Sequence, residues 1–434
     1  MGGRRITVRF RKTQEWLLNL ISAAGGISAE TTQKRLEQAY QSDVEERAIK
    51  ILDPFNRKST HKILCVEVGA AHDVIRPSIY HALHALGFEI DTILYGKSPD
   101  AHWDFFSSTP YQQRRELTVD EYELLMLLNS SLICEYDFVF FNTNFVYTKD
   151  RFDSGYDYIQ LLDFLRIPIR SKYGCLTIAP HPQGYKNWSL HTSWFSHLGA
   201  HGSGMLSCDY FGDGERVSGG KENLFLVSGN VNPTQKNHSM VFDAARKLVG
   251  KGVSNFKILI NGDGILDVPE DLKDVLVFLN ENKPPKLFSI LSQTNFIISG
   301  FDSSVEWQRE AYGRGTCSAA FMYSLGFLKP YIVEHYFAEA FRLTDSTAII
   351  YEHGMLAEAM ERAIRMSDKE YRDMRQHVKE ERDRRRNLSV QTVSEAMKKQ
   401  KRRMSQPLLF LKAKLLFLLK IIKYSILAHK RKLN

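Results

Sequence analysis

The sequence lacks several features that would place it in well-known classes of protein. Its five cysteines form no CxxC pair and no cluster with histidine at zinc-binding spacing, which excludes a zinc module and a disulfide scaffold. No segment has the roughly 18 uninterrupted apolar residues that a transmembrane helix needs. Low-complexity tracts and a clear internal repeat are also absent. We therefore expect a globular, cytoplasmic protein with reduced thiols.

The basic residues are not distributed evenly along the chain. The chain has 58 Lys and Arg against 50 Asp and Glu, a net charge of +8. From Lys398 onward there are 12 basic residues and no acidic ones, which leaves 46 basic against 50 acidic residues in the body. A slightly acidic body argues against a broad nucleic-acid-binding surface, so we predict no nucleic-acid partner.

What is present is a repeated alternation of strand-like and helix-like segments. Short apolar runs such as KILCVEVG (62–69) and LFLVSGN (224–230) are each followed by a helical pattern, which predicts βαβ units in parallel sheets. We predict an α/β protein with two doubly wound Rossmann-like domains facing a cleft. The expected divisions are a helical N-terminal extension over 1–60, a first, acceptor-side domain over 61–212, a second, donor-binding domain over 221–386, and a basic amphipathic tail over 387–434.

Four motifs in the second half occur in a characteristic order. They are SGNVNPTQKNH (228–238), ILINGDG (258–264), YGRGTCSAAFMYSLGFLKPYIV (312–333) and IIYEHGMLAEAMERAI (349–364). Over residues 224–366 the chain resembles the donor-binding domain of GT-B glycosyltransferases of the bacterial surface-polysaccharide and lipopolysaccharide type. The resemblance implies an enzyme that takes a sugar from a nucleotide-sugar donor, with no cofactor and no metal.

The resemblance also implies a set of donor-binding residues. Lys236 matches a basic residue that contacts the donor diphosphate, where a fixed cation would stabilise the developing charge. Asn232 stands where many relatives have an arginine. Small and hydroxyl residues before the helix at 319–326 would present backbone N–H groups to a phosphate. The further candidates for donor binding are Arg309, Glu310, Gly315, Thr316, Cys317, Ser318 and Glu352.

Catalytic candidates come from the first half of the chain. His72 and Asp73 follow the strand at 62–69, and His181 follows a strand that ends near 179. An inverting transferase needs a general base for the acceptor hydroxyl, and these residues supply imidazole or carboxylate groups. The Glu-x7-Glu pair of many retaining relatives is missing, so retention and inversion both stay open.

The tail at 407–429 is rich in Leu, Ile and Phe, with lysines between them. On a helix Lys412, Lys420 and Lys423 fall on one face, as in a helix that lies in an anionic membrane surface. Packing on the protein itself or on a partner copy is the alternative. The interfacial reading predicts a peripheral enzyme on the inner face of the cell membrane and a lipid-linked glycan acceptor.

Two other functions fit the same fold. One is a sugar-nucleotide epimerase, which needs a carboxylate pair in the cleft and no interfacial tail. The other is a non-catalytic, membrane-associated scaffold, which the missing glutamate pair would permit.

Overall fold

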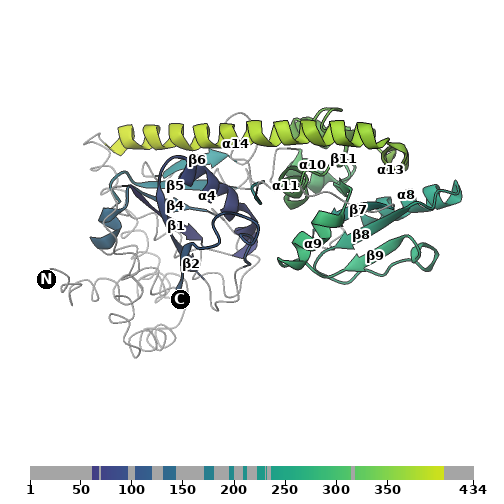
Figure 1. The fold of residues 1–434 in the computed structure, drawn as a ribbon, viewed down its shortest axis with the longest axis horizontal. Coiled ribbons are helices and arrows are strands. Elements are labelled where there is room, and N and C mark those ends of the chain that lie inside the picture. The colour runs from purple at the N-terminus through teal and green to yellow at the C-terminus, as the bar shows by residue number, and fades with distance from the viewer. Residues whose placement is uncertain are drawn as a thin grey trace, which may run out of the picture.

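Each half of the chain folds around a six-stranded sheet, and one long helix runs past both (Figure 1). Every strand pair that the structure describes is parallel. This confirms the two doubly wound α/β domains expected from the sequence. The computed structural model describes residues 61–67, 70–95, 103–119, 131–142, 171–179, 195–199, 209–212, 222–229, 231, 236–313 and 318–404. The extension predicted over 1–60 lies outside these ranges.

The first sheet has the strand order β3-β2-β1-β4-β5-β6. Its order reverses between β1 and β4, so the carboxyl ends of these two strands form its switch point, where open α/β sheets bind ligands. All six residues of β1 are buried, as expected for the centre of a covered sheet. The strands are β1 (Lys62–Glu67), β2 (Glu89–Tyr95), β3 (Arg115–Val119), β4 (Phe138–Phe141), β5 (Cys175–Ala179) and β6 (Phe195–Gly199).

The second sheet repeats this pattern with the order β12-β11-β10-β7-β8-β9. Its switch point lies between β7 and β10. Apolar runs at 224–230, 256–264, 275–280, 294–302, 329–334 and 346–352 predict all six of these strands, whereas β3 and β6 of the first sheet have no such signal. The strands are β7 (Asn223–Ser228), β8 (Phe256–Asn261), β9 (Leu276–Leu279), β10 (Phe296–Ile298), β11 (Tyr331–Glu334) and β12 (Ala348–Tyr351).

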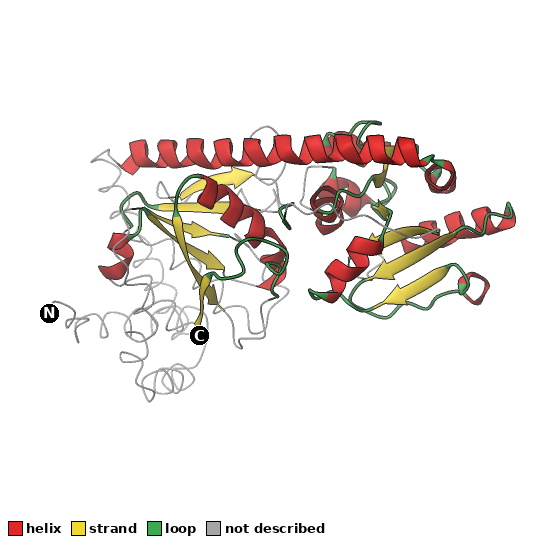
Figure 2. Ribbon diagram, viewed as in Figure 1, coloured by secondary structure: helices red, strands yellow, loops and turns green. Residues whose placement is uncertain are grey.

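Helices connect and cover the strands (Figure 2). In α8 the stripe Val241, Ala244, Ala245 and Leu248 is buried, which is the face that the helical spacing predicts. The helices are η2 (Ala70–Ile75), α4 (Arg76–Ala85), η4 (Ser131–Glu135), α8 (His238–Gly250), η7 (Glu270–Leu272), α9 (Lys286–Gln293), α10 (Glu306–Tyr312), α11 (Ala319–Gly326), α12 (His335–Phe341), α13 (Leu356–Arg365) and α14 (Asp368–Met404).

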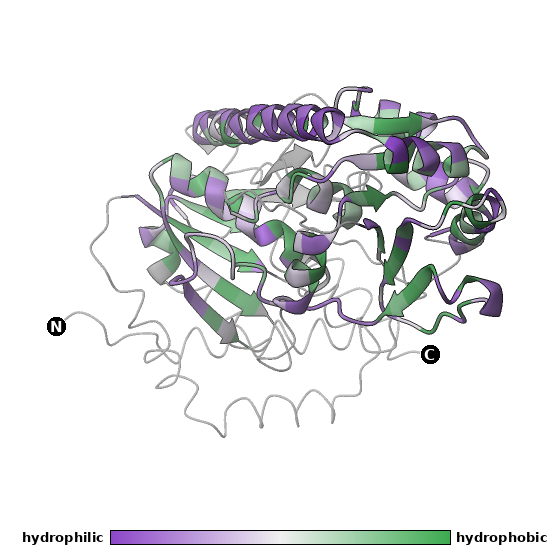
Figure 3. Cartoon of the chain, turned by 45° about the vertical axis from the view of Figure 1, so that its right-hand side comes forward, coloured by the Kyte–Doolittle hydropathy of each residue, from purple (hydrophilic) through white to green (hydrophobic). Residues whose placement is uncertain are grey.

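The long helix α14 joins the two domains. It packs on α11 of the second domain and on α4, β5 and β6 of the first. Near its start Arg375 Nε donates to the Leu328 carbonyl at 3.1 Å, and further along the Arg386 guanidinium lies 4.6 Å from the Tyr210 ring centroid. Although most of α14 is hydrophilic (Figure 3), Val393 and Met397 are buried.

The expected boundary between 386 and 387 therefore falls inside α14, and residues 387–404 belong to this helix. Among the described helices, none is both long enough and apolar enough to cross a bilayer. Lys412, Lys420 and Lys423 lie outside the described residues, so the membrane-binding tail stays a prediction.

Aromatic side chains fill the contact between the domains. The Phe211 ring centroid lies 5.7 Å from Phe288, 5.7 Å from Tyr323 and 5.5 Å from Phe327. Backbone also comes close here, because a Cβ at Gly326 would lie 2.4 Å from the Asp209 carbonyl oxygen. The first and second domains thus share one hydrophobic cluster.

Three described cysteines carry free thiols. Cys65 and Cys175 are buried in β1 and β5, as the apolar sequence around them predicts. Cys134, in η4, is exposed, although it also stands beside an apolar segment of the sequence.

Candidate functional site

The switch point of the second sheet holds a buried amine. Lys236 precedes α8, and its side chain is only 5% exposed. Its Nζ donates to the Ser299 carbonyl, just after β10, and lies 3.9 Å from the centroid of the Phe301 ring. Gly300, at φ +64°, lets the backbone pass close to this side chain, because a Cβ there would lie 3.0 Å from Lys236 Cδ.

Burial lowers the pKa of the Lys236 amine from its ordinary 10.5 to about 7. His238, two residues on, is also buried. Burial first and the charge of Lys236 second lower its pKa to about 4, so this imidazole is neutral at pH 7. The switch point therefore contains one amine that gains or loses its charge near neutral pH.

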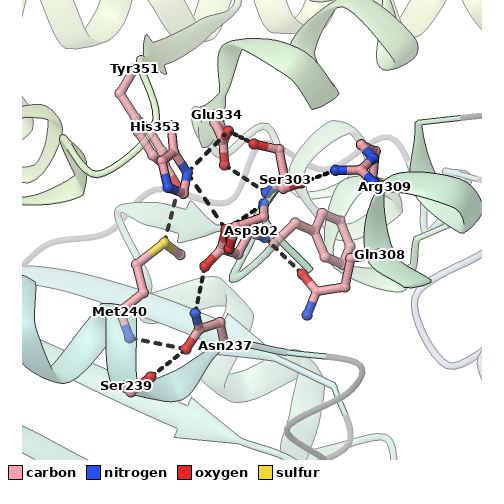
Figure 4. Close-up of polar contacts among 12 residues, drawn as sticks. Asn237, Ser239, Met240, Asp302, Ser303, Gln308, Arg309, Glu334, Tyr351 and His353 are labelled. Carbon is pink, nitrogen blue, oxygen red and sulfur yellow. Dashed lines mark hydrogen bonds and ion pairs between the residues drawn. The ribbon is translucent and has the colours of Figure 1, made fainter. Parts of the chain in front are cut away.

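Asp302, which follows Phe301 in the chain, is held by its neighbours (Figure 4). Asn237, the N-cap of α8, donates from Nδ2 to Asp302 Oδ2 at 2.6 Å, and Ser304 donates from its backbone N–H to Oδ1 at 2.8 Å. Burial alone would raise the pKa of Asp302, but the hydrogen bonds from Ser304 and Asn237 outweigh it and hold that pKa below its usual value. The carboxylate is therefore fixed in its ionised form.

The ends of the next two strands add a carboxylate and an imidazole (Figure 4). Glu334, the last residue of β11, accepts a hydrogen bond from the Ser303 N–H at 3.1 Å and another from the Ser303 hydroxyl. His353, just beyond β12, places Nδ1 3.5 Å from Asp302 Oδ1 and 3.5 Å from Glu334 Oε1. Both carboxylates are buried, whereas the His353 side chain is 56% exposed.

These three residues, Asp302, Glu334 and His353, form a group whose possible ligand atoms lie within 4.8 Å of one another, and we refer to it as the acidic cluster. Two carboxylates and an imidazole suit a divalent cation. They also suit hydroxyl groups, because a hydroxyl group can donate a hydrogen bond to a carboxylate and the imidazole can orient it. All four carboxylate oxygens already accept a hydrogen bond from the protein, so the cluster is held without a metal.

Three further predicted donor-binding residues lie in the second domain. Arg309, on α10, donates from Nη1 to the carbonyl of Ser303 at 3.2 Å, and Ser303 in turn donates to Glu334 (Figure 4). Glu310 follows on the same helix. Glu352 is 74% exposed, with Oε1 3.6 Å from His335 Nδ1.

The predicted phosphate loop is described only at its end. Ser318 caps α11, and its hydroxyl accepts from the Phe321 N–H at 3.5 Å, as the sequence predicts for a helix start. Its role toward a phosphate stays a prediction. Gly315, Thr316 and Cys317 lie outside the described residues.

The catalytic candidates of the first domain have unequal surroundings. Asp73 is 1% exposed, accepts from the Trp103 N–H at 2.7 Å and pairs with Arg76 at 3.6 Å, so its carboxylate holds the chain together locally. His72 lies beside it on η2. His181 lies outside the described residues. A catalytic role for these three, and a cleft between the domains, stay predictions.

Sequence reasoning missed the acidic cluster, although the signal was present. Asp302, Glu334 and His353 each stand at or just after the end of a predicted strand, in IISGFD, YIVE and IIYEH. Carboxyl ends of parallel strands meet at one edge of a sheet, so polar residues there converge. Within the motif at 349–364, Glu352 was predicted to bind the donor, and His353 was not.

Comparison with known proteins gives only remote likenesses. No protein-family model matches, and no curated protein does. Among solved structures the chain is similar to the Anabaena protein Alr3699/HepE in complex with UDP and glucose, at 9% identity and a TM-score of 0.46 over 78% of this chain and 99% of that one. WaaG, a glycosyltransferase of lipopolysaccharide biosynthesis, shows 12% identity and a TM-score of 0.37 over 73% and 95%.

A UDP-N-acetylglucosamine 2-epimerase homologue from Listeria monocytogenes shows 10% identity and a TM-score of 0.39 over 73% of this chain and 91% of that one. These scores are all below 0.5. The fold of two Rossmann-like domains therefore rests on the two parallel sheets of the chain itself.

Proposed function

We propose that this chain is a glycosyltransferase that takes a sugar from a nucleotide-sugar donor bound at the carboxyl edge of the second sheet. The observation that carries the proposal is the position of Lys236, whose amine lies at the switch point of that sheet. When a glycosidic bond to a nucleotide diphosphate breaks, negative charge builds up on the leaving oxygen. A preorganised cation at that point stabilises the transition state more than the bound donor.

The acidic cluster supplies the complementary part of such a site. Asp302 and Glu334 accept hydrogen bonds, and hydroxyl groups of a sugar donate them. His353 is exposed and held by both carboxylates. A cation for phosphate beside carboxylates for hydroxyls suits a ligand that is anionic at one end and rich in hydroxyls at the other, as a nucleotide sugar is.

The acceptor belongs to the same proposal. A basic, leucine-rich tail would hold the enzyme at the inner face of an anionic membrane, where the acceptor would be a lipid-linked glycan of surface polysaccharide assembly. Predicted acceptor contacts come from the loops after residues 69 and 179, with His72, Asp73 and His181 as base candidates.

Thermal unfolding in the presence of UDP-, GDP-, dTDP- and CMP-linked sugars tests the donor site. A ligand present at about 100 times its dissociation constant adds about 2.7 kcal/mol of stability. One nucleotide should raise the melting temperature, and Lys236→Ala should abolish the shift. Lys257→Ala is the matched control, since this half-buried lysine on β8 pairs with Glu222 at 3.7 Å and should leave the shift intact. Stabilisation by no nucleotide would refute the donor site and favour the scaffold.

Sugar-nucleotide epimerisation is a second candidate, because Asp302 and Glu334 provide the carboxylate pair that such a reaction needs. Incubation with a UDP-N-acetyl sugar alone, followed by proton NMR, separates the two. A new epimer without release of UDP would identify an epimerase, whereas a transferase leaves the sugar configuration unchanged until an acceptor is added.

A further inference from the structure

We propose that Asn142 and Glu67, at the switch point of the first sheet, form a subsite for an uncharged, hydroxyl-bearing group: a sugar ring of the acceptor. This inference rests on the proposed function, because the second sheet would hold the donor and leave the first for the acceptor.

The two side chains lie next to each other at the sheet edge. Strands β1 and β4 are paired so that Val66 stands opposite Phe141, and the Asn142 N–H donates to the Val66 carbonyl at 3.0 Å. The next residues, Glu67 and Asn142, therefore follow in register and point to the same face of the sheet. Both are fully buried. They thus stand where the strand order reverses and a ligand is expected.

The carboxamide of Asn142 is unusual in having no hydrogen-bond partner for either Nδ2 or Oδ1 among the described residues. Buried polar groups are nearly always paired, since leaving one unpaired costs free energy that the fold must offset. A side chain kept at this position without a protein partner is therefore expected to have a partner that the free protein does not contain.

Asn261 also stands at the carboxyl end of a strand, and its side-chain amide does have hydrogen-bond partners. It is the last residue of β8 and is also fully buried. Its Nδ2 donates to the Glu281 carbonyl at 3.1 Å, and its Oδ1 accepts from the Glu281 N–H at 2.9 Å. The second sheet thus closes its asparagine with backbone, while the first sheet leaves the amide of Asn142 for another molecule.

The chemistry of the pair indicates the class of ligand. A carboxamide offers one acceptor and two donor hydrogens, which a pair of hydroxyl groups matches because each hydroxyl both donates and accepts. The neighbouring carboxyl group of Glu67 disfavours a phosphate, because two sets of oxygens would meet with no hydrogen between them. A neutral sugar ring therefore fits this subsite better than the phosphate of a lipid carrier.

The first experiment compares two substitutions in urea denaturation. Asn142→Leu removes an amide without a protein partner and should leave the midpoint unchanged or raise it, whereas Asn261→Leu breaks two hydrogen bonds and should lower it. An equal fall in both variants would overturn the proposal, because Asn142 would then have a structural partner.

The second experiment measures sugar binding directly by saturation-transfer-difference NMR with a mixture of methyl glycosides. Wild-type protein should transfer saturation to at least one of them, and Asn142→Leu should reduce the transfer about tenfold or more, because the lost partner groups are not replaced. The absence of transfer from wild type, or equal transfer from the variant, would overturn the subsite.

Nucleotide-induced stabilisation is measured on the same samples. If Asn142→Leu loses glycoside binding and no nucleotide stabilises either protein, the subsite stands and the proposed transferase fails. If nucleotides stabilise both proteins and glycosides bind neither, the transferase stands and the subsite fails.

Discussion

The buried amine of Lys236 makes the stability of the protein depend on pH in a way that can be calculated. The folded protein holds its pKa near 7, while the unfolded chain returns it to 10.5. Between these values the unfolded state binds a proton that the folded state does not, so this group makes stability rise as the pH rises from about 7 to about 10.5. Below pH 7 the amine is charged in both states, and its burial destabilises the fold fully.

The magnitude follows from the width of that window. A difference of about 3.5 pKa units corresponds to about 5 kcal/mol, gained at up to about 1.4 kcal/mol for each pH unit. Lys236→Met keeps the length of the side chain and removes the titrating group. We expect the variant to be more stable than wild type at pH 7, with the difference shrinking steadily toward pH 10.

Urea denaturation of both proteins at several pH values between 7 and 10 provides the measurement. Titrations of other groups, such as the buried thiols, occur in both proteins and cancel in the difference. His238 has a pKa of about 4 and does not titrate in this range. A constant difference across the range would refute the reasoning, since it would mean that Lys236 is charged throughout, held by the Phe301 ring and the Ser299 carbonyl.

The same proton links Lys236 to its proposed ligand. A bound diphosphate favours the charged amine, so nucleotide binding above pH 7 should take up a proton. If the bound pKa lies far above 8, affinity should fall about fivefold from pH 7 to pH 8. Calorimetry in buffers of different ionisation enthalpy measures this uptake, and Lys236→Arg should abolish it. Binding without proton uptake in wild type would show that the amine does not meet the phosphates.

Two further predictions concern other parts of the molecule. Gly326→Ala would place a methyl group 2.4 Å from the Asp209 carbonyl oxygen and should lower the free energy of unfolding by about 1 to 3 kcal/mol. Gly250→Ala is the control, because nothing lies within 4 Å of the new carbon, and it should not destabilise the protein. Urea denaturation that ranks the two variants the other way would contradict the close contact between the domains. Removal of divalent cations with EDTA should leave nucleotide-induced stabilisation intact, because Asp302 and Glu334 are already held by protein donors. Loss with EDTA and recovery with Mn²⁺ would instead identify a metal site.

The sequence was sufficient for the second sheet because its strands are short apolar runs bounded by turn residues. β7, β8 and β10 all have this pattern. The buried face of α8 could likewise be predicted, from the helical spacing of its apolar residues. The edge strand β3, RELTV, is different. It mixes polar and apolar residues, is mostly half-buried and stands at the edge of the sheet among the described strands, so its sequence carries little apolar signal.

The candidate site was harder to predict than the fold for a related reason. Lys236 was found because a motif surrounds it, but nothing in the motif indicates that its amine is buried against Ser299 and Phe301, residues more than sixty positions away. The acidic cluster joins three strand ends that are separated by loops and helices. Only the strand order decides which ends become neighbours, and that order is a long-range property.

Strand order also explains why the same residue type behaves differently in the two domains. Asn142 follows β4 at the place where the first sheet reverses, and Asn261 ends β8, which lies away from the reversal of the second sheet. The backbone at Glu281, beyond β9, folds back to satisfy Asn261. The switch point of an open α/β sheet is the place where a ligand is expected, and β8 does not stand there. An unsatisfied amide at such a position is therefore what a sheet arranged for ligand binding should contain.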